Sequence, residues 1–362
     1  MSSSGPGVNP GPSFLSDEAS LSMVDDNLSM SEDKLPIPSD STLFLPLVER
    51  LRQLAGLQGK RHVQAPAAVF PHQPFAALGP AAALGDDAGL VPGVAGPLLL
   101  ACEGMHPALV AEDPWFAGWS AVLVNLSDIA AMGGRPLALV NSLWSQGEGP
   151  EQPLLAGMRF ACDKFAIPMV GGHTNLQSPY TALSVAVLGT APGPVLSARA
   201  AKAGDLCCLL VNINGRFHRH YPFWDAATHA PAAQLRSQLA LLVELAAKGF
   251  CHAAKDVSMG GIIGTAVMFA EAAGCRLELD LDAIVPPVGV DREAWLGCFP
   301  SYGYLLAVDS AQLAPLQAAV APDLDLRCEP IGRFAAGAAS VQLGCAAGSA
   351  ELWQGGELLT GF

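Results

Sequence analysis

The order of apolar and polar positions predicts a chain that alternates helices with strands. Residues 115–132 are mostly apolar, and they follow Asp113 and Pro114 and precede Gly133. These flanking residues commonly begin and end a helix, so we predict one helix from 114 to 132. The first half also contains patterns typical of a second helix at 153–165 and of strands at 136–144, 167–170 and 181–188.

The second half shows the same mixture. Apolar runs predict strands at 206–211, 276–281, 303–308 and 327–334, and helical spacing predicts helices at 231–248, 259–273 and 310–320. Both halves combine helices with strands, which indicates an α+β molecule of two domains. We place an N-terminal domain at 42–194, beginning with a helix at 41–57, a C-terminal domain at 195–345, and a C-terminal tail at 346–362.

Residues 1–41 are expected to be a disordered acidic tail. Residues 1–40 carry seven acidic residues but only one lysine, and they are rich in Ser, Gly and Pro. Such a segment buries too little apolar surface to offset the entropy lost on ordering.

Composition excludes several classes of protein. The chain has 33 Asp and Glu against 19 Lys and Arg, a net charge of −14, so nucleic acid is not expected as a partner. No apolar run is long enough to span a bilayer, so we expect a cytoplasmic protein with no membrane contact. The nine cysteines form no CxxC pair, which argues against a disulfide framework or a zinc ribbon.

The candidate chemistry lies in acidic residues beside glycines, because the two common glycine-rich phosphate loops are absent. Adjacent Asp86 and Asp87 follow Gly85, a pattern typical either of a solvated turn or of a metal site. Asn125 and Asp128 share one face of the predicted apolar helix, where an ionised carboxylate requires a partner or a metal. The alternative is an aspartate that caps a neighbouring turn.

Three further segments add polar groups next to predicted strands or helices. The run from Gly171 to Thr174 follows a strand and favours either phosphate binding by backbone N–H groups or a tight turn. Lys255 and Asp256 precede a helix, where they indicate either an ordinary helix start or a site for a metal-bound phosphate. Glu103 follows a strand and lies near His106, in what is otherwise a loop pattern.

These motifs together resemble a known superfamily. GDDA at 85–88, NLSDIAAMGGRP at 125–136, GGHT at 171–174 and KDVSMGG at 255–261 occur in the order found in the superfamily of aminoimidazole ribonucleotide (AIR) synthase. Thiamine-phosphate kinase, selenophosphate synthetase, the hydrogenase-maturation dehydratase and formylglycinamide ribonucleotide amidotransferase belong to it. The resemblance covers about 84–334, and EGMH, DPWFAGW and FPSYG are most similar to an AIR synthase-related branch.

The resemblance implies a two-domain PurM-like fold. Its N-terminal mixed-sheet domain would pair with its twin in a dimer barrel, and its C-terminal domain would be an α/β sandwich, with ATP between them. The implied magnesium ligands are Asp86, Asp87, Glu103, Asp128 and Asp256. The implied nucleotide contacts are Gly85, Asn125, Asp128, Gly171, Gly172, His173 and Thr174, and the implied catalytic residues are His173, Lys255 and Asp256.

One metal ligand has two possible alignments. Glu103 matches either the aspartate of the family's usual Thr-Thr-Asp or the first residue of the E-G-V-H segment of thiamine-phosphate kinases. In the second alignment the aspartate of Thr-Thr-Asp has no equivalent here.

The resemblance implies an enzyme that uses ATP and Mg²⁺ to phosphorylate a small molecule, as a kinase or as a synthase that activates a carbonyl oxygen, and that works as a homodimer. The selenophosphate and hydrogenase-maturation activities are disfavoured, because no cysteine precedes Cys102 and the sequence ends without one. Thiamine-phosphate kinase is one alternative, although its G-G-E-D-Y segment is replaced by Phe299–Gly303 and its DVSDG by DVSMG. A nucleotide-binding partner protein without catalysis is another.

Overall fold

The structure is a computed structural model that describes residues 68–70, 75–78, 92–93, 96–320 and 324–354. The expected acidic tail, the helix expected at 41–57 and the Gly85–Asp87 turn lie outside these residues. In the described part of the chain, no helix is long and apolar enough to cross a membrane.

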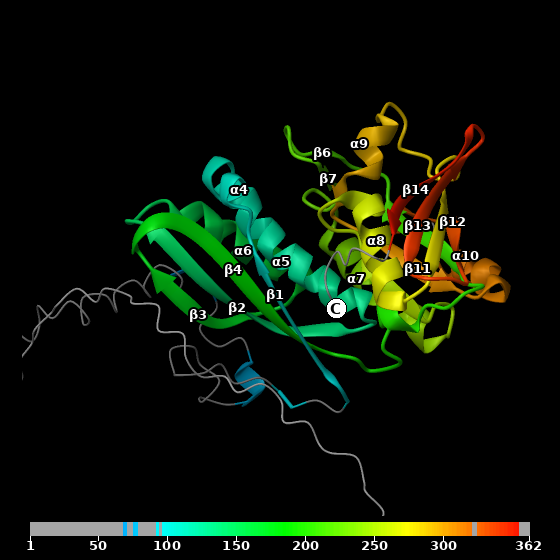
Figure 1. Cartoon of the computed structure of the whole chain (residues 1–362). Helices are drawn as coiled ribbons and strands as arrows, with labels where there is room; N and C mark the ends of the chain where they lie inside the picture. Colours follow the sequence, from blue (N-terminus) through cyan, green and yellow to red (C-terminus); the bar gives the residue numbers. More distant parts are fainter. Residues whose placement is uncertain (1–67, 71–74, 79–91, 94–95, 321–323, 355–362) are drawn as a thin grey trace, which may run out of the picture. The chain divides into compact units, whose positions relative to one another are not determined.

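A four-stranded sheet forms the base of the first half (Figure 1). Its strands are β1 (Leu98–Gly104), β2 (Arg135–Gln146), β3 (Met169–Asn175) and β4 (Gln177–Thr190), in the order β1-β4-β2-β3. β4 is antiparallel to both of its neighbours, whereas β2 and β3 are parallel. The short 3₁₀ helix η2 (Ala76–Leu78) precedes this sheet in the chain.

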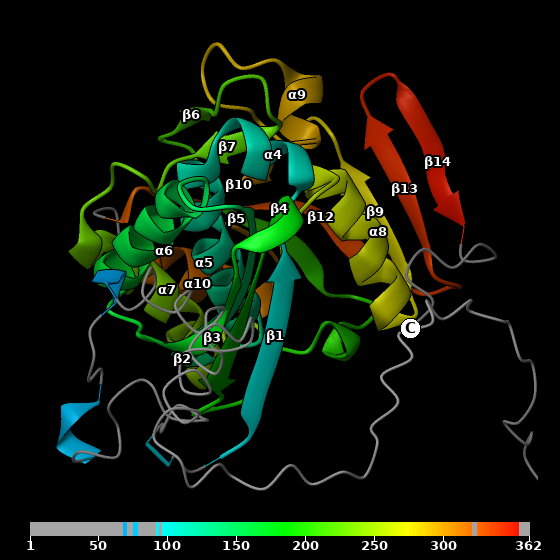
Figure 2. The ribbon, with the colours of Figure 1, turned by 90° about the vertical axis from the view of Figure 1, so that its left-hand side faces the viewer.

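Helices cover one face of this sheet. They are α4 (Pro107–Glu112), α5 (Pro114–Ala131) and α6 (Glu151–Phe165), and Figures 1 and 2 show them on the same side of the strands. α5 and α6 approach closely because glycines face each other's backbone. A Cβ on Gly118 would lie 2.1 Å from the Leu154 carbonyl oxygen, and one on Gly157 would lie 2.0 Å from that of Trp115.

A seven-stranded sheet forms the second half. Its strands are β5 (Leu206–Asn212), β8 (Ala253–Asp256), β9 (Arg276–Asp280), β11 (Gly303–Val308), β12 (Leu326–Ala335), β13 (Ser340–Cys345) and β14 (Gly348–Gln354), in the order β14-β13-β9-β12-β5-β11-β8. Its helices are α7 (Ala232–Ala247), α8 (Gly261–Ala273), α9 (Arg292–Leu296) and α10 (Leu313–Ala319), with 3₁₀ turns η4 (Ala198–Ala200) and η5 (Ser310–Gln312).

Helices pack on both faces of this larger sheet, which makes it an α/β sandwich. Phe269 of α8 shares one apolar cluster with Leu209 and Leu305 of the sheet. Leu242 of α7 shares another with Leu210 and Leu306. Alternate residues of β5 and β11 therefore supply the two cores, as the period of two in a strand requires.

A third, small sheet joins the two halves. It contains β6 (Arg216–Phe217), β7 (Phe223–Asp225) and β10 (Phe299–Pro300). The turn between β6 and β7 contacts the start of α5, where Asp113 Oδ2 lies 3.0 Å from His218 Nε2 and 2.8 Å from an Arg219 guanidinium nitrogen. Asp113 Oδ1 also accepts a hydrogen bond from the Phe116 backbone N–H at 3.3 Å, so one carboxylate caps α5 and binds the second half.

The observed elements follow most of the sequence-based predictions, with several differences, among them that Glu103 lies within β1 and that Lys255 and Asp256 end the strand β8. Gly171–Thr174 form part of strand β3 and not a turn after it, since β2 pairs with them in parallel. Residues 348–354, expected in a tail, form strand β14 against β13. The segment after β5, for which no strand was predicted, contributes the short strands β6 and β7.

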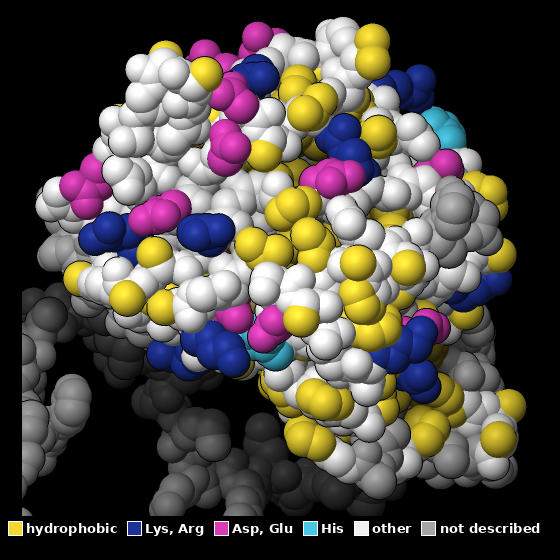
Figure 3. Space-filling model, turned by 90° about the vertical axis from the view of Figure 1, so that its right-hand side faces the viewer, with side chains coloured by type: hydrophobic (Ala, Val, Ile, Leu, Met, Phe, Trp, Pro, Cys, Tyr) yellow, Lys and Arg dark blue, Asp and Glu magenta, His cyan; other side chains and the backbone are white. Residues whose placement is uncertain are grey.

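Acidic and basic side chains are interspersed on the face drawn in Figure 3, with hydrophobic side chains between them. The net charge of −14 is therefore not gathered into one acidic field on this face.

Candidate functional site

A cavity of about 630 Å³ lies between α5 and the strands that follow β5 in the chain. This volume is within the range of about 300–1,000 Å³ that is typical of small-molecule sites. Its walls come from both halves of the chain: from β1 and α5 in the first half, and from β7, β8, β10, the segment before α8 and α8 itself in the second. A ligand there would touch segments more than a hundred residues apart.

Helix α5 presents one continuous face to this cavity. The residues that line it recur three or four positions apart, which is the spacing of one helical face: Phe116, Trp119, Ser120, Leu123, Val124, Ser127 and Asp128. Asp128 is in the last turn of the helix and is only partly exposed. The polar end of an otherwise apolar face therefore meets the cavity where α5 ends.

Asp256 is the last residue of β8 and is buried, with 9% of its surface exposed. β8 pairs antiparallel with β11, and this register sets Asp256 opposite Tyr304, which is also buried. Helix α5 packs against β8. The same packing that forms the core between the two halves thus brings Asp128 and Asp256 to one wall of the cavity.

The acidic side chains of this wall repel one another. Burial, followed by the charges of Asp256 and Glu103, raises the pKa of Asp128 from 3.8 to about 8, although Lys255 acts in the opposite direction. Burial also raises the pKa of Asp256, again opposed by Lys255. Partial burial, followed by the charge of Asp256, raises the pKa of Glu103. Three carboxyl groups therefore share one lysine, an arrangement that attracts a further cation.

The chemistry of these donors suits magnesium. Mg²⁺ prefers oxygen ligands and is usually held by one or two carboxylates, with waters and substrate phosphates completing the shell. Within the described residues, no three His, Cys, Asp or Glu side chains are arranged to hold a metal by themselves. A cation here would thus take its remaining ligands from phosphates, from water or from Asp86 and Asp87, which lie outside the described residues.

The structure brings together four of the residues predicted from the sequence: Glu103, Asp128, Lys255 and Asp256. Asn125 is fully buried and donates a 2.8 Å hydrogen bond from Nδ2 to the Ala121 carbonyl oxygen of its own helix, so it does not line the cavity. Its Oδ1 is buried without a hydrogen-bond partner.

The segment from Gly171 to Thr174 does not belong to the wall of this cavity. It belongs to β3, the edge of the first sheet opposite to β1, and none of its residues lines the cavity. The His173 side chain is exposed there, and Thr174 is buried. Gly172 has a φ of +153°, and a Cβ at this position would lie 2.4 Å from the Asn141 carbonyl oxygen. The roles predicted for this segment remain predictions.

Several cavity residues were not predicted as site residues. Phe299, Pro300 and Ser301 line this cavity, and so do Met105 and Met259. The aromatics of the FPSYG segment stand next to a turn and before a strand, a pattern that indicates either a pocket wall or a core, and the structure puts Phe299, Pro300 and Ser301 in the cavity wall. No local signal in the sequence links it to α5, because the contact depends on how the small sheet β6-β7-β10 joins the two halves.

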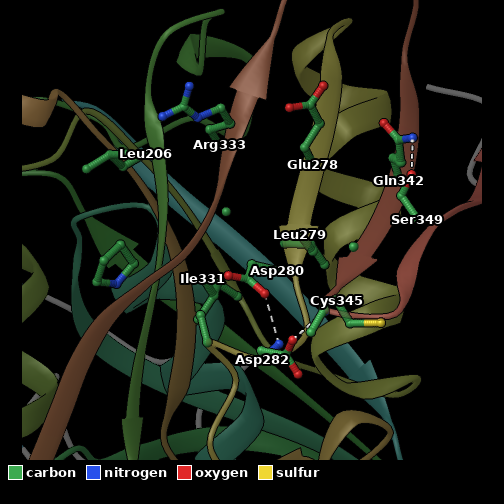
Figure 4. Close-up of a pocket in the computed structure, with 15 residues that line it drawn as sticks. Leu206, Glu278, Leu279, Asp280, Asp282, Ile331, Arg333, Gln342, Cys345 and Ser349 are labelled. Atoms are coloured by element: carbon green, nitrogen blue, oxygen red, sulfur yellow. Dashed lines mark hydrogen bonds between the residues drawn. The ribbon is translucent and has the colours of Figure 1, made fainter.

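A second cavity, also about 630 Å³, lies in the second half (Figure 4). It is an open groove along β9, β12 and β13, and Glu278, Asp280 and Asp282 line it. Asp282 already has partners, because it accepts hydrogen bonds from the Ala346 backbone N–H at 2.7 Å and from Arg292 at 3.2 Å. These bonds lower the pKa of Asp282. The groove therefore lacks the unbalanced charge of the cavity at α5.

Two family models match the chain. The N-terminal domain of AIR synthase related protein matches residues 85–191, and its C-terminal domain matches residues 213–343. An uncharacterised protein of Synechocystis is 48% identical over 267 residues, covering 74% of this chain and 82% of that protein. A selenide, water dikinase of Trichlorobacter lovleyi is 29% identical over 266 residues, covering 68% of this chain and 74% of the dikinase.

Solved structures of low sequence identity share the fold. The hydrogenase maturation protein HypE in complex with ATP superposes with a TM-score of 0.58 at 18% identity, covering 76% of this chain and 89% of HypE. Thiamine-monophosphate kinase from Stenotrophomonas maltophilia gives a TM-score of 0.56 at 24% identity, covering 74% and 90%. The chain has the two-domain PurM-like α+β fold and belongs to the family of AIR synthase-related proteins.

Proposed function

We propose that this protein transfers the γ-phosphoryl group of ATP to an oxygen of a small molecule, with Mg²⁺ as the required cation. The observation that carries this proposal is the acidic wall of the α5 cavity, where Glu103, Asp128 and Asp256 share the single cation of Lys255. Relatives named as kinases and a fold neighbour in complex with ATP support the same class of reaction.

The proposed reaction requires little covalent chemistry from the protein. An acceptor oxygen attacks the γ-phosphorus, the bond from that phosphorus to the β,γ-bridging oxygen breaks, and ADP leaves with the bonding electrons. A proton from an acceptor hydroxyl passes to solvent or to a carboxylate. The demands on the chain are to position the two substrates and to balance the charge that develops on the transferred group.

The residues of the wall can meet these demands. Asp128 and Asp256 would hold the cation that neutralises the triphosphate, and Glu103 would contribute from β1. Lys255, which is half-buried and precedes Asp256 in β8, would contact a phosphoryl oxygen and limit the repulsion among the acids. The fixed strand β8 and the last turn of α5 hold these groups on regular elements and not on loops.

We also propose that the protein is a homodimer that pairs through the uncovered face of the first sheet. Among the described residues, helices cover only one face of this sheet. The strand register puts Leu98, Leu100 and Val140 on the other face, where they are 59%, 79% and 42% exposed. Clustered exposed apolar side chains on a sheet favour association. Light scattering should give the mass of two chains, and Leu100→Asp should shift it towards one chain.

The test of the proposed reaction has two stages. Purified protein is first heated with and without Mg-ATP, since a ligand that binds only the folded state raises the melting temperature. It is then incubated with γ-labelled ATP, Mg²⁺ and fractions of a small-molecule extract, and labelled products are separated. Transfer of label that requires both the fraction and Mg²⁺ is expected. A protein without stabilisation and without transfer contradicts the proposal.

Two other outcomes are informative. Thiamine monophosphate is the first pure acceptor to include, because curated relatives carry the name thiamine-monophosphate kinase. Stabilisation by Mg-ATP without transfer to any fraction would favour a nucleotide-binding partner protein. The exposed Met259 at the cavity mouth is the observation behind that alternative, since it sets an apolar group beside Ser258 and Asp256.

A further inference from the structure

A buried tyrosine lies next to the acidic wall of the α5 cavity. Tyr304 belongs to β11, and only 1% of its surface is exposed. The register of β11 with β8 sets it opposite Asp256, and residues that oppose each other in an antiparallel pair have their side chains on the same face. Tyr304 is not among the described residues that line the cavity. It could therefore affect a ligand there only through the residues that do.

The end of α5 packs on the same face as Tyr304. Ala131, in the last turn of α5, shares one apolar cluster with it. Burial raises the pKa of the Tyr304 hydroxyl, and the Ser127 side chain lowers it. The charges of Asp256 and then of Asp128 also raise this pKa. The phenol is thus within electrostatic reach of both carboxyl groups, one from β8 and the other from α5.

The hydroxyl of Tyr304 is a buried donor without an acceptor. It has no hydrogen-bond partner within the described residues, whereas most buried polar side-chain atoms in folded proteins have one, because a buried hydroxyl without a partner costs free energy. Tyr302, two residues earlier in the chain, shows the usual arrangement. It is also buried, and its hydroxyl donates a 2.9 Å hydrogen bond to the Gln238 carbonyl oxygen.

The two carboxyl groups beside Tyr304 have the opposite deficiency. Among the described residues, no side chain donates a hydrogen bond to the carboxyl group of Asp128 or of Asp256. Thr265 of α8 bonds only the backbone of Asp256, since its hydroxyl donates to the carbonyl oxygen at 3.4 Å. Carboxylates that bind a metal are usually hydrogen-bonded themselves, which fixes the direction of their oxygens. A donor without an acceptor therefore lies beside two acceptors without a side-chain donor.

We propose that Tyr304 is a positioning residue of the acidic wall, whose hydroxyl donates a hydrogen bond to a carboxylate oxygen of Asp128 or Asp256 when these residues hold a cation. The bond would orient that carboxylate so that its other oxygen faces the cavity. This inference rests on the role proposed above for the two aspartates in holding Mg²⁺. It adds a residue that touches no substrate and acts through those that do.

Two variants that each remove one buried hydroxyl test this inference. Tyr304→Phe removes the unpartnered hydroxyl, and Tyr302→Phe removes the one bonded to Gln238; the two rings lie 5.0 Å apart in one apolar cluster and both are kept. In EDTA, Tyr302→Phe should lower the melting temperature by about 2–4 °C, because a hydrogen bond is lost. Tyr304→Phe should leave it within about 1 °C of the wild type or raise it, because no bond is lost.

The effect on the cation is measured through ADP binding and not through catalysis. The increase in melting temperature caused by saturating ADP is recorded at rising Mg²⁺ concentrations, and the concentration that gives half of the increase is compared. It should rise at least about tenfold in Tyr304→Phe, which is the usual loss when the hydrogen-bond partner of a metal ligand is removed. In Tyr302→Phe it should stay within about twofold of the wild type.

The outcomes separate this inference from the proposed function. An unchanged Mg²⁺ requirement in Tyr304→Phe, or an equal rise in both variants, overturns the inference. So does a fall in melting temperature in EDTA as large as that of Tyr302→Phe, because it would show that the Tyr304 hydroxyl serves only stability. In these cases the proposed function stands if ADP stabilises the wild type in the presence of Mg²⁺. A wild type that ADP does not stabilise at any Mg²⁺ concentration overturns both.

Discussion

Two cavities of the described residues have the same volume, about 630 Å³, and both are lined by acidic side chains, yet they differ in electrostatics. In the groove of the second half, Asp282 is bonded to Arg292 and to the backbone N–H of Ala346, and its pKa is lowered. In the cavity at α5, burial and then the charges of Asp256 and Glu103 raise the pKa of Asp128 to about 8.

The volume of a cavity and the number of acids that line it therefore do not by themselves identify a cation-binding site. The acids of the groove are satisfied within the protein, so they gain little from an added cation. The acids at α5 destabilise one another in the absence of a cation, and the folded chain must hold them together against that repulsion. Such an arrangement persists where another constraint requires it, and function is the usual constraint.

The electrostatic difference between the two cavities is tested most directly by neutralising one acid in each. Asp128→Asn should lower the rate of ATP-dependent transfer by about 100-fold or more, because a group that stabilises developing charge is lost. The paired change Asp282→Asn should leave the rate within about twofold of the wild type. Initial rates at saturating Mg-ATP measure both. Equal losses of transfer rate in the two variants would contradict the electrostatic difference between the cavities.

A second prediction concerns the position of α5, which carries the acidic wall. Gly157→Ala should lower the free energy of unfolding by about 2–3 kcal/mol, because the new methyl group would lie 2.0 Å from the Trp115 carbonyl oxygen and must displace α5 from α6. Gly193→Ala is the control, since no atom lies within 4 Å of its added Cβ. Urea unfolding of both variants measures the difference, and similar midpoints would contradict the close packing.

A third prediction uses the pKa of Asp128 in the absence of divalent cations. A carboxyl group with a pKa raised from 3.8 to about 8 in the folded state binds its proton more tightly when folded. Folding is therefore favoured at low pH, and this advantage is lost as the pH rises towards 8. Between about pH 4 and pH 8, the melting temperature of the wild type should fall by a few degrees relative to that of Asp128→Asn.

The difference between the two melting curves, measured in EDTA, isolates this group from the other carboxyl groups. Parallel curves for the wild type and Asp128→Asn would contradict the raised pKa. Asp282→Asn should show the opposite tendency, because the pKa of Asp282 is lowered and its contribution is lost as the pH falls.

The smallest expected effect concerns a thiol in the groove. Cys345 is exposed and lines the groove, so N-ethylmaleimide should label it at a rate that Mg-ATP does not change. Peptide mapping follows the reaction, and the buried Cys162 serves as the unreactive reference because burial raises its pKa to about 12. Protection of Cys345 by Mg-ATP would indicate that the nucleotide binds in the groove and not in the cavity at α5.

Much of the fold could be predicted from the sequence because its signals are local. Asp113 and Pro114 mark the start of α5 through their own preferences, and the apolar run of β11 marks a buried strand. β14 was not predicted because its exposed residues show no apolar run. Its strand character depends on pairing with β13, which no local pattern encodes.

The candidate site could be predicted only in its acidic part. Asp128 and Asp256 lie in motifs that the sequence displays intact. The aromatic segment of Phe299 fits a pocket wall or a core equally until the fold decides between them, and Met105 has no local signal. Asn125 shows the converse limit. A helical spacing of three put it on the face of Asp128, but its side chain turns back to the Ala121 carbonyl oxygen and the cavity lies on the adjacent face.

The double use of Asp113 has a consequence for how the molecule unfolds. One oxygen of this carboxylate caps the helix that carries Asp128, and the other binds His218 and Arg219 from the second half. If the halves separated, Asp113 would lose His218 and Arg219, the two residues that orient its carboxylate at the start of α5. We expect the two halves to melt in one cooperative transition, so that the first half, expressed alone, does not keep a native-like start of α5.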